Sequence, residues 1–145
     1  MLINAKSSLT DLKVIELLEL AVHEDEQALA AAQATYGSDD SYLLRLYQEE
    51  GETIGLIGFQ IDPVGTMIIH HISVYPEFRN QGFARGLILE ALMEQSPDTI
   101  LAVVNEESAD FYRNIGFVVT SSGTDAVGQE QFKCVYHAVE SEDEY

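Results

Sequence analysis

The sequence predicts an α+β fold in which a mostly antiparallel sheet of six to seven strands is flanked by about four helices. Three observations predict it. Apolar residues recur at helical spacing early in the chain, at Leu12, Ile15, Leu18 and Val22. The middle of the chain consists of short β-branched and aromatic runs separated by turn residues. Later, the apolar run Ile100–Val104 is typical of a strand that is covered on both faces.

The first elements are a short strand and two helices. Leu2–Ala5 is an apolar edge, and Ser7–Asp11 supplies hydroxyls and a carboxylate that cap a helix starting at Leu12. The alanine-rich segment Gln27–Thr35 predicts a second helix. The charged link His23–Glu26 between them either faces the entrance of a site or is simply solvated.

The later elements are predicted from turn residues and from changes of hydrophobic period. A three-strand meander ends at Pro76, because proline cannot continue a β-ladder. One domain is expected over residues 1–137, and the acidic residues 138–145 are expected to form a mobile tail. The predicted strands and helices are, in order, the strands Tyr42–Gln48, Thr53–Ile61 and Thr66–Val74, the helix Phe83–Gln95, the strand Ile100–Val104, the helix Ser108–Asn114, and the strands Phe117–Thr120 and Gln131–His137.

The chain is strongly acidic, with 25 Asp and Glu residues against 7 Lys and Arg and a formal net charge of −18. This charge argues against a nucleic-acid partner, because phosphate contacts require basic surface. It argues equally against binding to an anionic membrane. Attraction of a cationic partner and a plain role in solubility both remain open. Arg79, Arg85 and Arg113 lie close to the two motifs described below, which is where an anionic ligand would bind.

Cysteine content and hydropathy indicate a cytoplasmic protein. Cys134 is the single cysteine, so no intrachain disulfide can form. Cys134 has no neighbouring cysteine to form a metal pair, and no metal is predicted. No stretch reaches the roughly 20 uncharged apolar residues of a membrane helix, and residues 1–8 lack the apolar run of a signal peptide.

The segment Arg79–Ala84 leads directly from a predicted strand into a predicted helix. The first turn of a helix carries backbone N–H groups without partners and the positive end of the helix dipole. An anion such as a phosphate satisfies both. Gly82 permits close approach or a positive φ angle, while Arg79 and Arg85 add positive charge. A tight turn that needs one glycine would look the same, and a nucleotide triphosphate loop is disfavoured because no Gly-Lys-Ser/Thr sequence is present.

The second motif is Asn105–Phe117, which follows the apolar strand. Together the two motifs resemble the GNAT superfamily of acyl-CoA-dependent N-acyltransferases. Arg79–Ala84 is similar to the family's pyrophosphate loop, Gln/Arg-x-x-Gly-x-Gly/Ala. Asn105–Phe117 is similar to its signature Asn-x-x-Ala-x-x-Phe-Tyr-x-x-x-Gly-Phe. The order of the motifs and their separation by a helix and a strand also match, and the resemblance covers about residues 53–137.

The resemblance implies a GNAT-like fold that is splayed at the strands Thr66–Val74 and Ile100–Val104. The pantetheine arm of acetyl-CoA would lie in the gap and pair with the backbone as an extra strand. It also implies that a main-chain N–H near Val74 stabilises charge on the thioester oxygen. The expected cofactor contacts are Ile72, Ser73, Val74, Arg79, Asn80, Gln81, Gly82, Phe83, Ala84, Arg85, Asn105, Ala109 and Tyr112.

The resemblance further implies an N-acetyltransferase in which a primary amine attacks acetyl-CoA directly. Tyr112 is the expected acid, because a phenol with a pKa of about 10 can protonate the departing thiolate. Many relatives carry a glutamate base on the strand matching Thr66–Val74, and this strand has no carboxylate. His70 is preferred over His71 as the base, since strict alternation puts the two on opposite faces and His70 on the face of Ile68, Ile72 and Val74. A packed histidine, a contribution from His23, Glu24 and Glu26, and proton loss to water remain alternatives.

The acceptor is not specified by any motif. Acidic residues near the predicted second helix, namely Glu24, Asp25, Glu26, Asp39 and Asp40, favour a cationic amine, so a small molecule, a polyamine or a peptide amine are all candidates. The acetyl group is expected only because it is the commonest donor in the family. An acyl-CoA-binding module without catalytic activity is the alternative function. A monomer and a homodimer are both compatible with the sequence.

Overall fold

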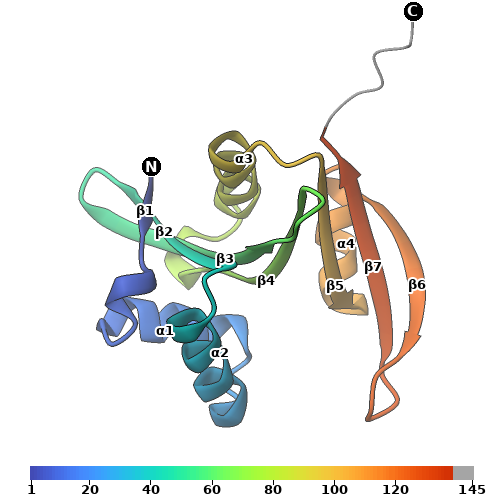
Figure 1. Ribbon diagram of the computed structural model, residues 1–145, viewed down its shortest axis with the longest axis horizontal. Coiled ribbons are helices and arrows are strands. Elements are labelled where there is room, and N and C mark those ends of the chain that lie inside the picture. Colours follow the sequence, from blue (N-terminus) through green and yellow to red (C-terminus); the bar gives the residue numbers. More distant parts are fainter. Residues whose placement is uncertain (139–145) are drawn as a thin grey trace, which may run out of the picture.

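The computed structural model describes residues 1–138 and confirms the predicted α+β architecture (Figure 1). Seven strands form one sheet in the order β1-β2-β3-β4-β5-β7-β6, and β4–β5 is its parallel pair. Residues 139–145, which hold nearly all of the predicted acidic tail, lie outside the described residues. The elements are β1 (Leu2–Asn4), η1 (Lys6–Ser8), α1 (Leu12–Ala21), α2 (Glu26–Ser38), β2 (Tyr42–Glu49), β3 (Glu52–Ile61), β4 (Thr66–Val74), η2 (Pro76–Phe78), α3 (Phe83–Gln95), β5 (Thr99–Asn105), α4 (Glu106–Asn114), β6 (Val118–Thr124) and β7 (Glu130–His137).

Side-chain caps explain where three of the helices begin. The Asp11 carboxylate accepts from the Lys13 amide at 2.9 Å and caps α1, as the sequence predicts. Asp25 accepts from two amides at the start of α2. Asn105 accepts from the Ser108 amide at 3.0 Å and caps α4. Helix α3 begins differently, and its start is described with the site.

Two hydrophobic cores lie on opposite faces of the sheet. One core includes Leu87, Ile88 and Ala91 of α3 together with Tyr112 of α4. The other core is formed by α1 and α2 against the first strands of the sheet, and its buried members include Leu17. Each fully buried aliphatic or aromatic side chain contributes roughly 1.5–3 kcal/mol relative to its exposed state. Helix α1 therefore packs on one face of β4, and α3 packs on the other.

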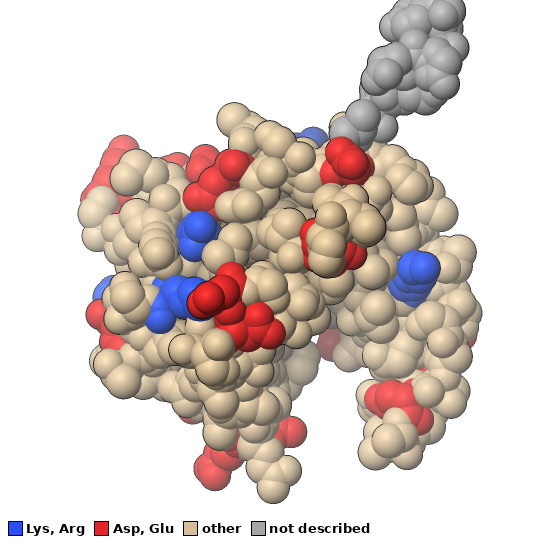
Figure 2. Space-filling model, in the orientation of Figure 1, with Lys and Arg blue, Asp and Glu red and all other residues tan. Residues whose placement is uncertain are grey.

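The sheet opens between β4 and β5, as the resemblance predicts. The two strands pair only from Thr66 with Thr99 to Ile69 with Ala102. Beyond this point the half of the sheet with β1–β4 and the half with β5–β7 diverge (Figure 1). The surface is hollowed between the α1–α2 side and the β5–β7 side (Figure 2).

A β-bulge at His70 coincides with the end of this pairing. Gly58 of β3 pairs with His71 and Phe59 pairs with Ile69, so His70 is the extra residue of β4. A bulge bends its strand and changes the side-chain phase. Consequently Met67 and Ile69 pack in the same core as Ile72 and Val74. The prediction of strict alternation along Thr66–Val74 is therefore wrong, because it assumed a strand without a bulge.

Among residues 1–138, no helix is both long and apolar enough to cross a membrane.

Candidate active site

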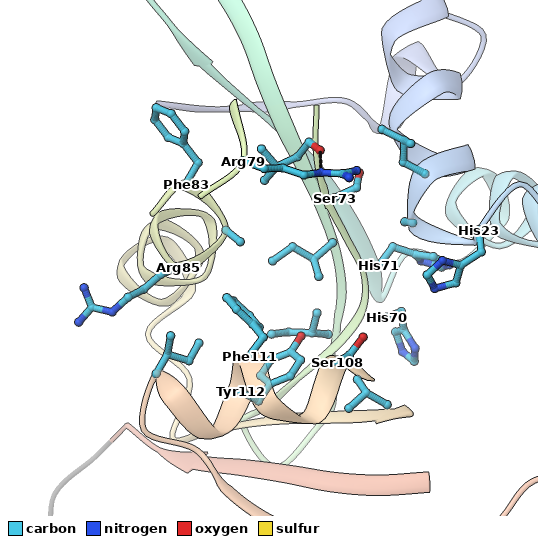
Figure 3. A pocket seen from close by; sticks show the side chains of 18 of the residues that line it. His23, His70, His71, Ser73, Arg79, Phe83, Arg85, Ser108, Phe111 and Tyr112 are labelled. Atoms are coloured by element: carbon cyan, nitrogen blue, oxygen red, sulfur yellow. Dashed lines mark hydrogen bonds between the residues drawn. The ribbon is translucent and has the colours of Figure 1, made fainter. Parts of the chain in front are cut away.

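A cleft of about 1040 Å³ lies where β4 and β5 separate. Its walls come from five parts of the chain: the end of α1 and the link to α2, the second half of β4, the loop entering α3, the end of β5, and α4. In Figure 3, His23, His70 and His71 are grouped at one end, while Phe83 and Arg85 lie at the other. The cleft therefore has a histidine end and an α3 end.

The main chain of β4 forms one wall of the cleft. From His71 to Val74 the strand pairs with β3 on one edge, and its pairing with β5 has already ended at Ile69. Backbone N–H and C=O groups on the open edge are thus available to an extended ligand, which can add to the sheet as a strand. The Ser73 hydroxyl donates to the Leu17 carbonyl at 2.6 Å and ties this part of β4 to α1.

The N-terminus of α3 closes the other end. Gly82 occupies its N-cap position with φ of 85°, and within the described part of the chain no side chain caps the helix there. The first bond of the helix runs from the Gly86 amide to the Gly82 carbonyl, so the preceding amides point out of the helix without intrahelical partners. Such an end binds anions, and the preceding loop holds Asn80 at φ of 63°. This geometry fits a pyrophosphate.

The three arginines near the motifs have different surroundings. Arg79 donates from Nε to the Val74 carbonyl at 3.0 Å, which places its guanidinium between the end of β4 and the α3 loop. Arg85 lines the cleft with its stem and extends its guanidinium outward (Figure 3). Arg113 instead pairs with Asp110 on α4 and is not a lining residue. The two arginines among the expected cofactor contacts, Arg79 and Arg85, thus line the cleft, and Arg113 is not one of those contacts.

Tyr112 reaches the cleft from α4. Its ring is 2% exposed and packs edge-on against Phe111 and Phe117, and its hydroxyl points into the cleft (Figure 3). Burial, with a smaller contribution from Cys134, raises the pKa of Tyr112 above its ordinary value. The phenol thus keeps its proton at neutral pH and is placed to donate it.

His70 ends a chain of directed hydrogen bonds. The Ser41 hydroxyl donates to the Asp39 carboxylate at 2.7 Å, so Ser41 Oγ accepts from the Gln60 amide at 3.3 Å. This fixes the amide oxygen of Gln60 toward His70 Nε2 at 3.2 Å, and that nitrogen must carry hydrogen. In the neutral ring, Nδ1 of His70 then carries no hydrogen, and its lone pair can accept a proton. The ring also stacks on Tyr42, and partial burial lowers its pKa.

His71 lies next to His70 at the histidine end of the cleft. Its Nδ1 is 2.7 Å from the hydroxyl of Tyr36 on α2. Burial, with a smaller contribution from His70, lowers the pKa of His71 to about 4. Both histidines line the cleft. The prediction that only one of them can face it is wrong, because the bulge brings both to the α2 side.

The link between α1 and α2 contributes His23 and Glu24 to the histidine end. Both adopt left-handed backbone angles, with φ of 56° and 63°. Such angles are uncommon outside glycine and cost energy that the surrounding fold must supply. The Glu24 amide donates to the Glu19 carbonyl at 2.8 Å and holds this turn. Of the five acidic residues singled out in the sequence, Glu24 is the one that lines the cleft.

Most of the predicted site residues are gathered here. Two predicted site residues do not line the cleft. The side chain of Gln81 donates to the Glu77 carbonyl instead, and Ala109 is fully buried. Counted from Asn105, the alanine of the signature falls on Ser108, which does line the cleft. Phe111 also lines the cleft and is only half-buried.

The residues that support the histidines were not predicted. Tyr36, Gln60 and Ser41 carry no motif, and their roles follow from contacts between distant segments. The only sequence signal is the composition of Tyr36–Tyr42, which is rich in hydroxyl groups. Among residues 1–138, no group of three His, Cys, Asp or Glu side chains is arranged to hold a metal ion.

Comparisons with known proteins point to one family. Residues 12–117 match the model of the Acetyltransferase (GNAT) family. The chain is 32% identical over 111 residues to an uncharacterised N-acetyltransferase of Bacillus methanolicus, covering 77% of this chain and 91% of that protein.

Solved structures share the fold at low identity. The aminoglycoside 6'-N-acetyltransferase from Enterococcus faecium superposes with a TM-score of 0.75 at 12% identity, over 99% of both chains. A GNAT family acetyltransferase from Elizabethkingia anophelis with acetyl-CoA bound superposes with a TM-score of 0.65 at 19% identity, over 84% of this chain and 88% of that chain. The family match, the sequence relative and the splayed sheet with its α3 loop agree. The chain is therefore an acyltransferase that belongs to the GNAT family of acetyltransferases.

Proposed function

We propose that this protein transfers the acetyl group of acetyl-CoA to a primary amine by direct attack. The observation that supports the proposal best is the junction of an open β4 edge with an uncapped α3 N-terminus in one cleft. The open edge suits an amide-bearing pantetheine arm, and the helix end suits a pyrophosphate. The main chain of Ile72–Val74 would hold the arm, and the loop from Arg79 to Arg85 would hold the phosphates. A structural neighbour with the same fold has acetyl-CoA bound, which supports acetyl-CoA as the ligand.

Three groups of the chain would act in the transfer. The amine nitrogen forms a bond to the thioester carbonyl carbon while the carbon–sulfur bond breaks. A backbone N–H near Val74 would stabilise negative charge on the carbonyl oxygen. Tyr112 would give its proton to the departing sulfur. His70 Nδ1 would take the proton that the amine loses, because its Nε2 is engaged with Gln60. The net result is an acetylated amine and free coenzyme A.

The first experiment titrates the protein with coenzyme A in a calorimeter and then assays acetyl transfer. We expect one-site binding with a dissociation constant in the range of about 1 μM to 1 mM that is typical of enzyme substrates. Transfer from acetyl-CoA is then measured against spermidine, an aminoglycoside, free amino acids and a lysine peptide. Lack of binding at millimolar coenzyme A would refute the proposal. Binding without transfer to any amine would identify a non-catalytic acyl-CoA-binding module instead.

Glu24 is expected to favour cationic acceptors. Glu24 lines the histidine end of the cleft, whereas Asp25 caps α2 and Asp39 accepts hydrogen bonds from Ser41. An exposed ion pair contributes at most about 1 kcal/mol, so Glu24→Gln should raise the KM for spermidine by about two- to fivefold. The affinity for coenzyme A should not change. Asp40→Asn removes an equally exposed charge outside the cleft and serves as the control. An equal effect of both variants would mean that only the net charge matters.

A further inference from the structure

Tyr36 and His71 form a partly buried polar contact at the histidine end of the cleft. Tyr36 is 0% exposed, and its hydroxyl lies 2.7 Å from His71 Nδ1. Gly58 pairs with His71 across the sheet, and a Cβ at this position would overlap the Tyr36 hydroxyl. The missing side chain of Gly58 thus creates the space in which the hydroxyl sits. The two rings also meet edge-on with centroids 5.5 Å apart.

The direction of this hydrogen bond follows from the surroundings of the hydroxyl. Within residues 1–138, His71 Nδ1 is the only hydrogen-bond partner of the Tyr36 hydroxyl. A buried O–H needs an acceptor for its hydrogen, and a neutral imidazole nitrogen without hydrogen is one. If Nδ1 carried the hydrogen, the hydroxyl hydrogen would have no acceptor. The Tyr36 O–H therefore donates to Nδ1, and the hydrogen of His71 is on Nε2.

We propose that Tyr36 is a positioning residue that holds His71 as the Nε2–H tautomer, which makes His71 a hydrogen-bond donor to an acceptor atom of the bound substrates other than the attacking nitrogen; this role in transfer rests on the proposed function. The two adjacent histidines then differ in their chemistry. His70 offers a lone pair at Nδ1, and His71 offers an N–H at Nε2. With a hydrogen on Nε2, His71 cannot accept a proton at that nitrogen.

The electrostatic surroundings agree with a neutral His71. Burial, with a smaller contribution from His70, lowers its pKa to about 4. Burial, with a smaller contribution from Tyr42, raises the pKa of Tyr36, so the phenol stays protonated. His23 and Glu24 from the α1–α2 link are the other titratable groups at this end of the cleft.

The test measures the tautomer directly by long-range ¹H–¹⁵N correlation on the ¹⁵N-labelled full-length protein near pH 7. His71→Gln assigns the resonances. In the unmodified protein we expect Nδ1 of His71 without hydrogen and Nε2 with it. Tyr36→Phe removes a hydrogen bond that only the neutral ring accepts at Nδ1. The variant should therefore show mixed tautomers and a pKa of His71 that is higher by roughly one unit. Gly58→Ala, which displaces the hydroxyl without removing it, should act in the same direction.

Tyr42→Phe is the matched control. Tyr42 contacts Tyr36 edge-on and stacks on His70, but its hydroxyl does not bond to either histidine ring. This variant should leave the tautomer of His71 unchanged. A hydrogen on Nδ1 in the unmodified protein would overturn the proposal. The proposal would also be overturned if the pKa of His71 fell or stayed constant in Tyr36→Phe. A fall would mean that the Tyr36 hydroxyl stabilises the charged imidazole ring, which donates from Nδ1, and a constant pKa would mean that the hydroxyl favours neither form.

Failure of this inference is distinguishable from failure of the proposed function. The tautomer is read in the protein without ligand, and coenzyme A binding is read separately by calorimetry. Tyr36→Phe should bind coenzyme A with unchanged affinity, since the α3 loop and the open edge of β4 do not involve Tyr36. If Tyr36→Phe binds coenzyme A normally and the tautomer of His71 is unaltered, only the proposed role of Tyr36 is rejected. An altered tautomer in a protein that does not bind coenzyme A rejects the proposed function and, with it, the role of His71 in transfer.

Discussion

Replacing Tyr112 by Phe is expected to lower kcat for acetyl transfer by about 10²- to 10⁴-fold, the range typical of a lost general acid. The aromatic ring, which packs against Phe111 and Phe117, is retained, so the fold and the cleft should be preserved. The hydroxyl that points into the cleft is lost (Figure 3). Because the hydroxyl would act on the departing sulfur, the affinity for coenzyme A should change little. Steady-state kinetics with the best amine of the panel and calorimetry with coenzyme A measure the two quantities.

The control for Tyr112→Phe is Tyr75→Phe. The Tyr75 hydroxyl donates to Glu16 at 2.7 Å, and Tyr75 does not line the main cleft. Its removal should leave kcat within about twofold, because it touches no group of the proposed transfer. If Tyr112→Phe retained full activity, water or another group would have to protonate the thiolate, and Tyr112 would have only a packing role.

The pH dependence of the transfer follows from the same groups. The pKa of Tyr112 is raised by burial, so activity should not fall on the alkaline side before pH exceeds the ordinary tyrosine value of about 10. The base must be unprotonated, and burial lowers the pKa of His70 below its ordinary 6.5. The acid limb of kcat/KM should therefore lie below pH 6.5. His70→Gln should abolish that limb, and an unchanged limb would exclude His70 as the base.

Replacing Gly82 by Glu is expected to weaken coenzyme A binding by more than about 100-fold. Two like charges about 4 Å apart near a protein surface repel by about 4 kcal/mol, and each 1.4 kcal/mol is tenfold in affinity. The new carboxylate would sit at the uncapped N-cap of α3, where the pyrophosphate is proposed to bind. Calorimetric titration with coenzyme A measures the loss.

Gly128→Glu separates this electrostatic effect from backbone strain. Gly128 has φ of 87°, close to the 85° of Gly82, and a Cβ at either position meets nothing within 4 Å. Both variants therefore place a glutamate at a left-handed position, but Gly128 is in the β6–β7 turn, outside the cleft. Gly128→Glu should bind coenzyme A normally. Equal binding by both variants would place the phosphates away from α3.

The sequence predicted the bounds of β4 and α3 and the loop with an uncapped helix start because these depend on local patterns. Strand β4 and helix α3 have the bounds expected from the sequence. The N-cap position of α3 has a positive φ angle, which favours glycine, and the residues next to it in the sequence form the rest of the loop. The capping carboxylate of Asp11 acts over two residues. In each case the interacting groups are close in sequence, so the pattern of residue types is sufficient.

The histidine end of the cleft was decided by the tertiary structure. The bulge at His70 arises from the register between β3 and β4, and no residue of Thr66–Val74 indicates it. The bulge reversed the predicted side-chain phase and put His70 and His71 in one cleft. Tyr36 is 35 residues from His71, and their contact depends on the absent side chain of Gly58. The sequence by itself thus determined the family and the loop proposed to bind phosphates, because the motifs behind both are local. The pairing of strands and the packing of α2 determined the hydrogen-bond partners of His70 and His71, on which their proposed roles rest, because these contacts join segments far apart in the chain.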